Sequence, residues 1–459
     1  MNGTYDVAIC GAGIAGVAAA YYLSVEHRVS RVCIIDAGDP LSLTSDKSTE
    51  CYRNWWPGPG TAMVEMSNRS IDLLESIADA TDNRIAMSRR GYAFATADPR
   101  TVNTLRAQAV DAAARGAGPF REHGSAMHSD YFAHPSEGWR NLPEGIDLLT
   151  DPALIQQHFP ALTDSACGLL HVRRCGWVSA QQLGAWMLEE ARAHGVTFIS
   201  GAMSAVNRAG GRVNAVTVQR GDGTTTELGV GALVLAPGPH LASVARLLDL
   251  ELPVTCECHV KVGLRDTLNA FPADAPLLSW CDPVRLPWSG EERDALAADA
   301  ESRYLLETFP PGVHGRPMGR SGHHYAWMLW TYDLADSEPT FPIEWDPHMP
   351  EIIIRGLSAM LPGMRGYFDP LPRTLVDGGY YCKTPENRPL VGPLPVDGAF
   401  VNAAYSGYGI MTSCAGGELL ANHLTGSALP DYADALLPSR YDDPTYLDQF
   451  GDARNAGQI

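Results

Sequence analysis

Basic residues are scarce in this sequence. Its 459 residues include 34 lysines and arginines against 53 aspartates and glutamates, which gives a formal net charge of -19 at pH 7. A surface this acidic repels both the phosphates of nucleic acids and anionic lipid headgroups. The charge therefore argues against nucleic acid and against a membrane as partners.

The sequence also lacks a long apolar run and any Cys-x-x-Cys pair. Without such a run the chain has no segment able to cross a bilayer. Several of its ten cysteines, among them Cys10, Cys33 and Cys167, lie within or beside apolar stretches. We expect them to be buried thiols rather than disulfides, as in a reducing cytoplasm.

One cluster of metal-ligand types occurs, at Cys256-Glu-Cys-His259. Alternation along a strand places Glu257 and His259 on one face and the two cysteines on the other. Four ligands therefore do not converge there, and we predict no metal site.

The chain shows no internal repeats, and 45% of its residues are hydrophobic. This composition indicates a globular protein, and the length suits two or three domains that can be interleaved.

A dinucleotide-binding fingerprint occupies the first residues. The stretch from Tyr5 to Leu23 contains a short apolar strand, then Gly11, Gly13 and Gly16, then a helix of small residues. The first glycine permits a tight turn, the second lets the backbone approach a pyrophosphate, and the third lets the helix lie close to the sheet. Because the motif starts at Tyr5, we expect no signal peptide ahead of it and a cytoplasmic location.

A second apolar run, Val32 to Ile35, ends in Asp36. An acid at this distance from the glycines accepts hydrogen bonds from the ribose of adenosine. It favours FAD or NAD over NADP, whose ribose carries a phosphate.

The middle of the chain alternates helix and strand. An amphipathic helix is predicted from Ala180 to His194, with Gly195 as its C-cap. Strands are predicted at 196–206 and 213–220. The buried strand within Ala232–Gly238 belongs with the first two strands, so the nucleotide domain resumes after an insertion.

The C-terminal part of the chain has a second glycine turn. The strand Ala399–Ala404 leads through Ser406-Gly-Tyr-Gly409 into a helix predicted from Ile410 to His423. The N-terminus of this helix offers N–H donors to negative charge. Residues beyond about 427 are polar and proline-spaced, which suits either a wrap over the surface or a partner contact.

These patterns predict an α/β protein with a Rossmann-like FAD-binding domain and an inserted, mainly antiparallel α+β substrate domain. The FAD-binding domain takes residues 1–90, 151–250 and 371–459, and the substrate or lid domain takes 91–150 and 251–370.

The combination resembles the D-amino-acid oxidase superfamily of FAD enzymes, which includes glycine oxidase, monomeric sarcosine oxidase and dimethylglycine dehydrogenase. The resemblance spans most of the chain. Six segments carry it: Gly11–Gly16, Asp36–Pro40, Gly176–Ser179, Leu235–Gly238, Thr384–Pro393 and Tyr405–Ile410.

In that family the first loop passes the pyrophosphate and the flavin, and the last turn lies along the flavin ring. The resemblance implies FAD as cofactor. The cofactor-binding residues it implies, together with those of the fingerprint, are Gly11, Gly13, Ile14, Ala15, Gly16, Asp36, Ala37, Thr44, Ser45, Lys47, Ser48, Met203, Gly238, Ser406, Gly407, Tyr408, Gly409 and Ile410.

The implied reaction is oxidation of a C–N bond in an amine or amino-acid-like small molecule. Hydride passes to flavin N5, and the resulting imine is hydrolysed. The expected catalytic residues are Lys47, Tyr381, Tyr408 and His259, with His323 and His324 as alternative bases.

Three departures from the family bear on the substrate and the acceptor. The arginine that clamps a substrate carboxylate in relatives is replaced by Tyr381, and a second family cation falls on Gly407 or Met411. Arg53, Arg316 and Arg388 are the alternative clamps, and each is also a candidate for a structural pairing. A cysteine that tethers the flavin in some relatives is nearest to Cys382, but out of register by about three residues.

The strand Tyr325–Tyr332 has no lysine where sarcosine oxidase activates oxygen, so Lys47 or Lys261 would have to substitute. Oxygen and an electron-transfer protein therefore both remain as acceptors. The alternative functions are a flavoprotein dehydrogenase subunit that passes electrons to a protein and a biosynthetic flavoenzyme with non-standard chemistry.

Overall fold

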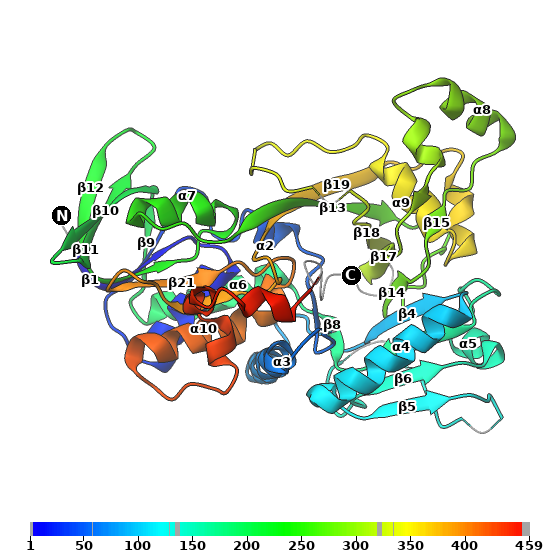
Figure 1. Cartoon of the computed structure of the whole chain (residues 1–459), viewed down its shortest axis with the longest axis horizontal. Helices are drawn as coiled ribbons and strands as arrows, with labels where there is room; N and C mark the ends of the chain where they lie inside the picture. The colour runs from blue at the N-terminus through cyan, green and yellow to red at the C-terminus, as the bar shows by residue number, and fades with distance from the viewer. Residues whose placement is uncertain are drawn as a thin grey trace.

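Two large sheets organise the chain into the two lobes seen in Figure 1. The computed structural model describes residues 3–56, 58–127, 129–133, 138–318, 324–333 and 335–451. Two long neighbouring strands, β13 (Thr255–Arg265) and β19 (Thr374–Lys383), reach from the second lobe towards the first (Figure 1).

The first sheet has a parallel centre. Its parallel strands, in spatial order, are β9 (Thr197–Ser200), β2 (Val32–Asp36), β1 (Thr4–Cys10), β12 (Thr225–Leu235) and β21 (Ala399–Ala403). An antiparallel meander of β10 (Ala202–Ala209) and β11 (Arg212–Gln219) continues from β12, and β20 (Leu390–Pro393) pairs with β21.

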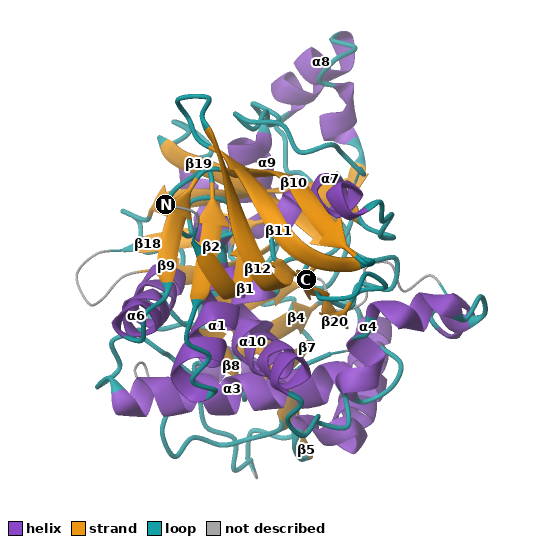
Figure 2. Ribbon diagram, turned by 90° about the vertical axis from the view of Figure 1, so that its left-hand side faces the viewer, coloured by secondary structure: helices purple, strands orange, loops and turns teal. Residues whose placement is uncertain are grey.

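Four helices gather beside this sheet, as Figure 2 shows: α1 (Ile14–Tyr21), α3 (Ala62–Ala80), α6 (Ala180–Ala193) and α10 (Gly409–Thr425). A parallel sheet flanked by apolar layers needs strands that are apolar on both faces, and β1 and β2 have such sequences. The predicted Rossmann-like domain is confirmed, and so are the helices now seen as α6 and α10.

The second sheet is mainly antiparallel, with two parallel pairs, β14 with β4 and β5 with β6. Its order is β19, β13, β18 (Tyr325–Leu329), β17 (His314–Met318), β14 (Leu277–Trp280), β4 (Tyr92–Thr96), β7 (Gly168–Val172), β6 (Ile146–Leu149) and β5 (Phe120–His123). Its helices are α4 (Pro99–Ala112), α5 (Pro152–His158), α8 (Gly290–Ala298) and α9 (Met349–Leu357). The inserted α+β domain is thus present.

Short elements complete the fold. They are α2 (Thr44–Lys47), α7 (Leu241–Ala245) and two small antiparallel pairs, β3 (Cys51–Arg53) with β8 (Cys175–Trp177) and β15 (Val284–Arg285) with β16 (Thr308–Phe309). Single helical turns follow at η3 (Gly238–His240) and, near the C-terminus, at η8 (Pro438–Asp442).

Sheet membership departs from the predicted boundaries at two strands. Strand β7 lies between β4 and β6, and β19 pairs with β13, so both belong to the second sheet rather than to the nucleotide-binding unit. The predicted strand 196–206 is also divided, because Gly201 (φ +153°) separates β9 from β10. A β-carbon at Gly201 would lie 2.8 Å from the carbonyl oxygen of Gln219.

All ten cysteines are thiols; Cys10 and Cys33 are buried, whereas Cys167 is half-buried. In the part of the chain that the structure describes, no helix combines the length and the apolar character needed to span a membrane.

Candidate active site

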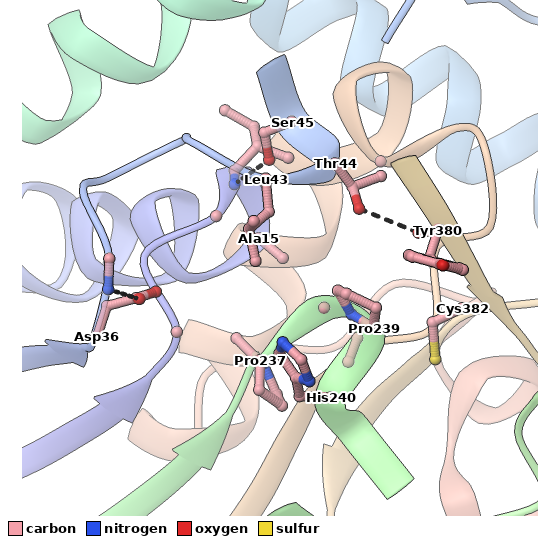
Figure 3. Close-up of a pocket in the computed structure, with 18 of the residues that line it drawn as sticks. Ala15, Asp36, Leu43, Thr44, Ser45, Pro237, Pro239, His240, Tyr380 and Cys382 are labelled. Carbon is pink, nitrogen blue, oxygen red and sulfur yellow. Dashed lines mark hydrogen bonds between the residues drawn. The ribbon is translucent and has the colours of Figure 1, made fainter. Parts of the chain in front are cut away.

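A cleft of about 680 Å³ lies at the carboxyl ends of the parallel strands and extends to strand β19 (Figure 3). Gly11 follows β1, Asp36 ends β2 and Ala236 follows β12, and all three line it. Tyr380 and Cys382 of β19 form part of its wall. Parallel α/β sheets bind their ligands at this edge.

The glycine turn after β1, at one end of the cleft, lets backbone segments and a ligand approach one another closely. Gly11 has φ +110°, and a β-carbon there would lie 2.1 Å from the carbonyl oxygen of Ala236. A β-carbon at Gly16 would lie 2.0 Å from the carbonyl oxygen of Gly11, so α1 packs directly on the turn. Gly13 caps α1 without a side-chain hydrogen bond. The positive end of the helix dipole is therefore directed at the cleft, as a pyrophosphate requires.

Asp36 is held at the rim of the same cleft. One carboxylate oxygen accepts from the Ala12 N–H at 2.6 Å, and the other accepts from the Gly38 N–H at 2.8 Å. Figure 3 shows Asp36 among the residues that line the cleft. Each carboxylate oxygen can accept a further hydrogen bond. The carboxylate is thus pre-oriented for a ribose hydroxyl.

The loop carrying α2 covers the centre of the cleft. Ser45 Oγ accepts from the Ile14 N–H at 2.9 Å, and the Thr44 hydroxyl donates to the Tyr380 carbonyl at 3.0 Å. The Lys261 ammonium donates to the carbonyls of Asp46 (3.2 Å) and Ser48 (3.0 Å). Lys261 therefore positions this loop from β13, and burial lowers its pKa.

Lys47 points away from the cleft. Its ammonium lies 2.8 Å from Asp46 and 3.2 Å from Asp377. Among the described residues that line the cleft there is no lysine. The roles predicted for Lys47 in cofactor binding and catalysis therefore have no geometric support.

The C-terminal glycine turn forms the far end. Ala404 (φ +59°) and Ser406 (φ +48°) adopt left-handed conformations, which cost about 1–3 kcal/mol each and concentrate at functional sites. The Ser406 N–H donates to the Cys382 carbonyl at 2.8 Å. A β-carbon at Gly407 would lie 2.3 Å from Cε2 of Tyr381, so the tyrosine ring rests on the turn.

Tyr408 does not line the cleft. Its hydroxyl donates to the carbonyl of Asn387, and its ring meets Trp56 edge-on with the centroids 4.8 Å apart. Its role is to join the turn to the Thr384–Arg388 loop. The predicted contact of Tyr408 with cofactor or substrate therefore stays a prediction.

A buried polar row stands behind Tyr381 on the same face of β13 and β19. The His259 ring stacks on the Tyr381 ring, with centroids 3.8 Å apart and planes inclined by 15°. His259 Nε2 lies 3.3 Å from Glu257, and the Lys383 ammonium lies 2.8 Å from the other oxygen of Glu257. The predicted side-by-side placement of Glu257 and His259 is confirmed.

His259 is engaged through both ring nitrogens. A carboxylate only accepts, so Nε2 donates to Glu257; Nδ1 lies 3.4 Å from the Thr331 hydroxyl. Burial lowers the pKa of His259, which keeps the imidazole neutral. His259 also does not line the cleft, so its geometry fits a support for Tyr381 better than the predicted base. Of the alternative bases, His324 is exposed and His323 lies outside the described residues.

The three arginines differ in their surroundings. Arg316 is buried and pairs with Glu50 at 2.9 Å, and Arg388 donates to the Pro59 carbonyl, so both are structural. Arg53 is also buried, and its guanidinium lies 5.8 Å from the centre of the Tyr92 ring. Its main-chain N–H contacts Met411 Sδ at 3.1 Å, next to Ile410 of the cleft wall.

All the predicted cofactor-binding residues except Gly16, Lys47 and Tyr408 line the cleft, and so does Tyr381. The prediction omitted Pro239, His240 and Phe341, which also line it. Pro239 and His240 directly follow Gly238 of the predicted turn, so that turn could have indicated them. Phe341 belongs to a loop distant in sequence, and no local pattern indicated it.

The lining fits FAD: a helix N-terminus whose cap residue is a glycine for the phosphates, an oriented carboxylate for the ribose, and two glycine-containing backbone turns. Within the described residues no group of three or more His, Cys, Asp or Glu side chains is arranged to hold a metal ion.

Comparisons with known proteins agree with this geometry. The family model described as FAD dependent oxidoreductase (DAO) matches residues 6–423. A search of curated proteins finds no significant match.

Solved structures share the fold over nearly the whole chain. L-proline dehydrogenase from P. horikoshii is 15% identical with a TM-score of 0.71, over 97% of this chain and 99% of that one. Glycine oxidase from Bacillus cereus is 15% identical with a TM-score of 0.67, over 95% and 98%. Iminodiacetate oxidase from Chelativorans is 17% identical with a TM-score of 0.67, over 94% and 98%.

Proposed function

The chain belongs to the DAO family of FAD-dependent oxidoreductases, and on this basis we propose that it oxidises the C–N bond of an amine or amino-acid-like substrate. FAD, when bound, accepts a hydride from the carbon that carries the nitrogen, and water hydrolyses the resulting imine. The names of the structural neighbours support this class, since they act on glycine, proline or iminodiacetate.

The observation that carries the proposal is the contact between Tyr381 and Gly407. It places an aromatic side chain from the second lobe against the turn at the end of the cofactor cleft. Burial raises the pKa of Tyr381 to about 12, so its phenol stays protonated at neutral pH. A protonated phenol both donates and accepts hydrogen bonds and suits a neutral amine.

We propose Arg53 as the cation that binds a substrate carboxylate. It is buried and aromatic rings surround it, which strengthens an electrostatic contact with an anion. It does not itself line the described cleft, but it follows the α2 loop directly in sequence and contacts the residue after Ile410. Its Nε donates to the Trp55 carbonyl at 3.1 Å, which fixes the orientation of the guanidinium.

A second candidate, a dehydrogenase that passes electrons to a protein, is favoured by one observation. The ammonium groups of Lys47 and Lys261 are both held outside the cleft, and the described lining residues include no lysine. The described lining therefore offers no lysine to activate oxygen.

The test starts from the visible spectrum of the purified holoenzyme, recorded before and after acid precipitation. Colour that remains with the precipitate indicates tethering, for which Cys382 and Cys10 are the thiols in the described lining of the cleft. A panel of amino acids and secondary amines is then added without oxygen. Bleaching by a panel member supports the proposal, and failure of the whole panel overturns the substrate class. Fast reoxidation in air excludes the dehydrogenase alternative.

Arg53→Met tests the carboxylate contact, with Arg100→Met as the matched control because the Arg100 side chain is 93% exposed. A hydrogen bond between charged groups contributes about 1.5–3 kcal/mol. We therefore expect a rise of about 10- to 100-fold in the amino-acid concentration for half-maximal reduction. An amine without a carboxylate should reduce the flavin of wild type and variant alike; equal losses for both substrates would contradict the assignment.

A further inference from the structure

Two cysteines face each other across the neighbouring strands that border the cofactor cleft. Cys256 of β13 and Cys382 of β19 are direct partners in the antiparallel register. Residues so paired have α-carbons about 4.5–5.5 Å apart, and disulfides span about 4.4–6.8 Å. The backbone therefore already satisfies the spacing that a bridge needs.

The two thiols are in contact. Of the ten cysteines, only Cys256 has a lowered pKa, which results from a hydrogen bond donated by the Cys382 thiol. The same contact and burial raise the pKa of Cys382. The Cys256 thiol donates in turn to the carbonyl oxygen of Pro239 at 3.5 Å. The pair thus contains one sulfur whose pKa is lowered and one whose pKa is raised, as an attacking and a resolving thiol require.

Cys382 of this pair borders the cofactor cleft. Cys382 and Pro239 both line the cleft, and Figure 3 draws Cys382 among its residues. Cys256 and Cys382 are otherwise buried, with 8% and 5% of their surface exposed. A small oxidant that enters the cleft therefore reaches Cys382, and Cys256 lies directly opposite it on β13.

The neighbouring cysteine supplies a built-in comparison. Cys258 lies two residues along β13 on the same face, but its partner on β19 is Tyr380. Its pKa is raised by burial. Proximity to the cleft alone does not make a reactive pair, because Cys258 has no thiol opposite it.

We propose that Cys256 and Cys382 form a reversible dithiol–disulfide site in the wall of the cofactor cleft, with hydrogen peroxide as the oxidant. The Cys256 thiolate attacks the peroxide, an S–O bond forms, the O–O bond breaks, and the hydroxide that leaves takes a proton to become water. The Cys382 sulfur then attacks the sulfenic sulfur, an S–S bond forms, the S–O bond breaks, and a second water leaves. Two thiols and one peroxide give one disulfide and two waters.

The bridge would join β19, at the edge of the second sheet, covalently to β13. Tyr381 is the residue before Cys382, and Ser406 donates to the Cys382 carbonyl. Oxidation would therefore constrain the backbone next to Tyr381 and the backbone to which the Ser406 turn is hydrogen-bonded. The site goes beyond the proposed function, because the bridge forms whatever the substrate is.

The test treats the intact holoenzyme with hydrogen peroxide, alkylates the remaining thiols in denaturant and maps tryptic peptides without reduction. Cleavage after lysine and arginine gives peptides 247–261 and 374–383, which carry Cys256 and Cys382. We expect these two peptides joined, a loss of two titratable thiols per chain, and recovery of both thiols with dithiothreitol.

Peptide 247–261 also contains Cys258, so variants assign the bridge. Cys256→Ser should abolish it, and Cys258→Ser, the matched control, should keep it. Cys382→Ser should leave Cys256 as a sulfenic acid that dimedone captures, a readout that also serves if the other variant folds poorly. Joined peptides that persist in Cys256→Ser, or a wild-type protein that keeps both thiols under peroxide, would overturn the proposal.

Discussion

Replacement of Arg440 by methionine should destabilise the protein strongly, although the residue lies far from the cleft along the chain. Arg440 belongs to the single turn η8, and its guanidinium lies 2.7 Å from Glu386. The two side chains are 3% and 0% exposed. Arg440 also donates to the carbonyls of Pro389 (3.0 Å) and Arg388 (3.1 Å).

The magnitude follows from what the variant leaves behind. Removal of one partner of a buried ion pair costs about 3–5 kcal/mol, because the other charge stays buried. Glu386 keeps hydrogen bonds from the hydroxyls of Tyr441 (2.7 Å) and Tyr446 (3.2 Å). We therefore expect the lower end of this range, about 3 kcal/mol of unfolding free energy.

The measurement is urea unfolding of FAD-saturated protein, followed by circular dichroism. The control is Arg212→Met, whose pair with Asp397 is equally short at 2.7 Å but 53% and 67% exposed. Such a pair contributes less than about 1 kcal/mol. Glu386→Gln combined with Arg440→Met should recover part of the loss, since no buried charge remains. The reasoning is refuted if Arg440→Met costs no more than Arg212→Met.

Three further predictions concern the cleft and the pH response. Gly11→Ala places a β-carbon 2.1 Å from the Ala236 carbonyl oxygen and should abolish FAD retention on gel filtration, whereas Gly290→Ala, with open space around it, should not. Burial lowers the pKa of His314 from 6.5 to about 4, so between these pH values the unfolded chain binds a proton that the folded protein does not. The free energy of unfolding should therefore be highest above pH 6.5 and fall by roughly 3 kcal/mol towards pH 4. His314→Gln should not show this fall. Burial raises the pKa of the Asp147 carboxyl, but hydrogen bonds and charge from its two arginines outweigh this and hold the pKa well below its usual range. The ionised carboxylate therefore stabilises the fold above the pKa of the unfolded chain, and this stabilisation is lost as the pH falls through the pKa of the folded protein. Asp147→Asn should be less stable at pH 7 and show a shallower acid transition in urea titrations.

Local sequence was sufficient for the nucleotide-binding end of the molecule. The strand, glycines and helix from Tyr5 to Leu23 are contiguous, and a β-carbon at Gly11 or Gly16 would clash with the backbone. The turn before α10 was found in the same way. A motif that folds on itself carries its geometry in its own spacing.

Local sequence was not sufficient where a strand pairs with segments distant in the chain. Strand β7 looks like any buried strand, and its place between β4 and β6 depends on backbone hydrogen bonds to segments distant in sequence. The C-terminal residues read only as a wrap or a partner contact. The structure shows Arg440 bound to Glu386 of the Thr384–Arg388 loop, which also accepts from Tyr408.

The sequence alone determined the cofactor class and the position of the cleft, because three spaced glycines and an acid after the second strand are local requirements of dinucleotide binding. Only the tertiary structure decided which side chains lie in or near the cleft. It turned Lys47 outwards to Asp377, set His259 behind Tyr381 and brought Cys256 opposite Cys382. These outcomes follow from strand register and burial, which depend on residues more than a hundred positions apart.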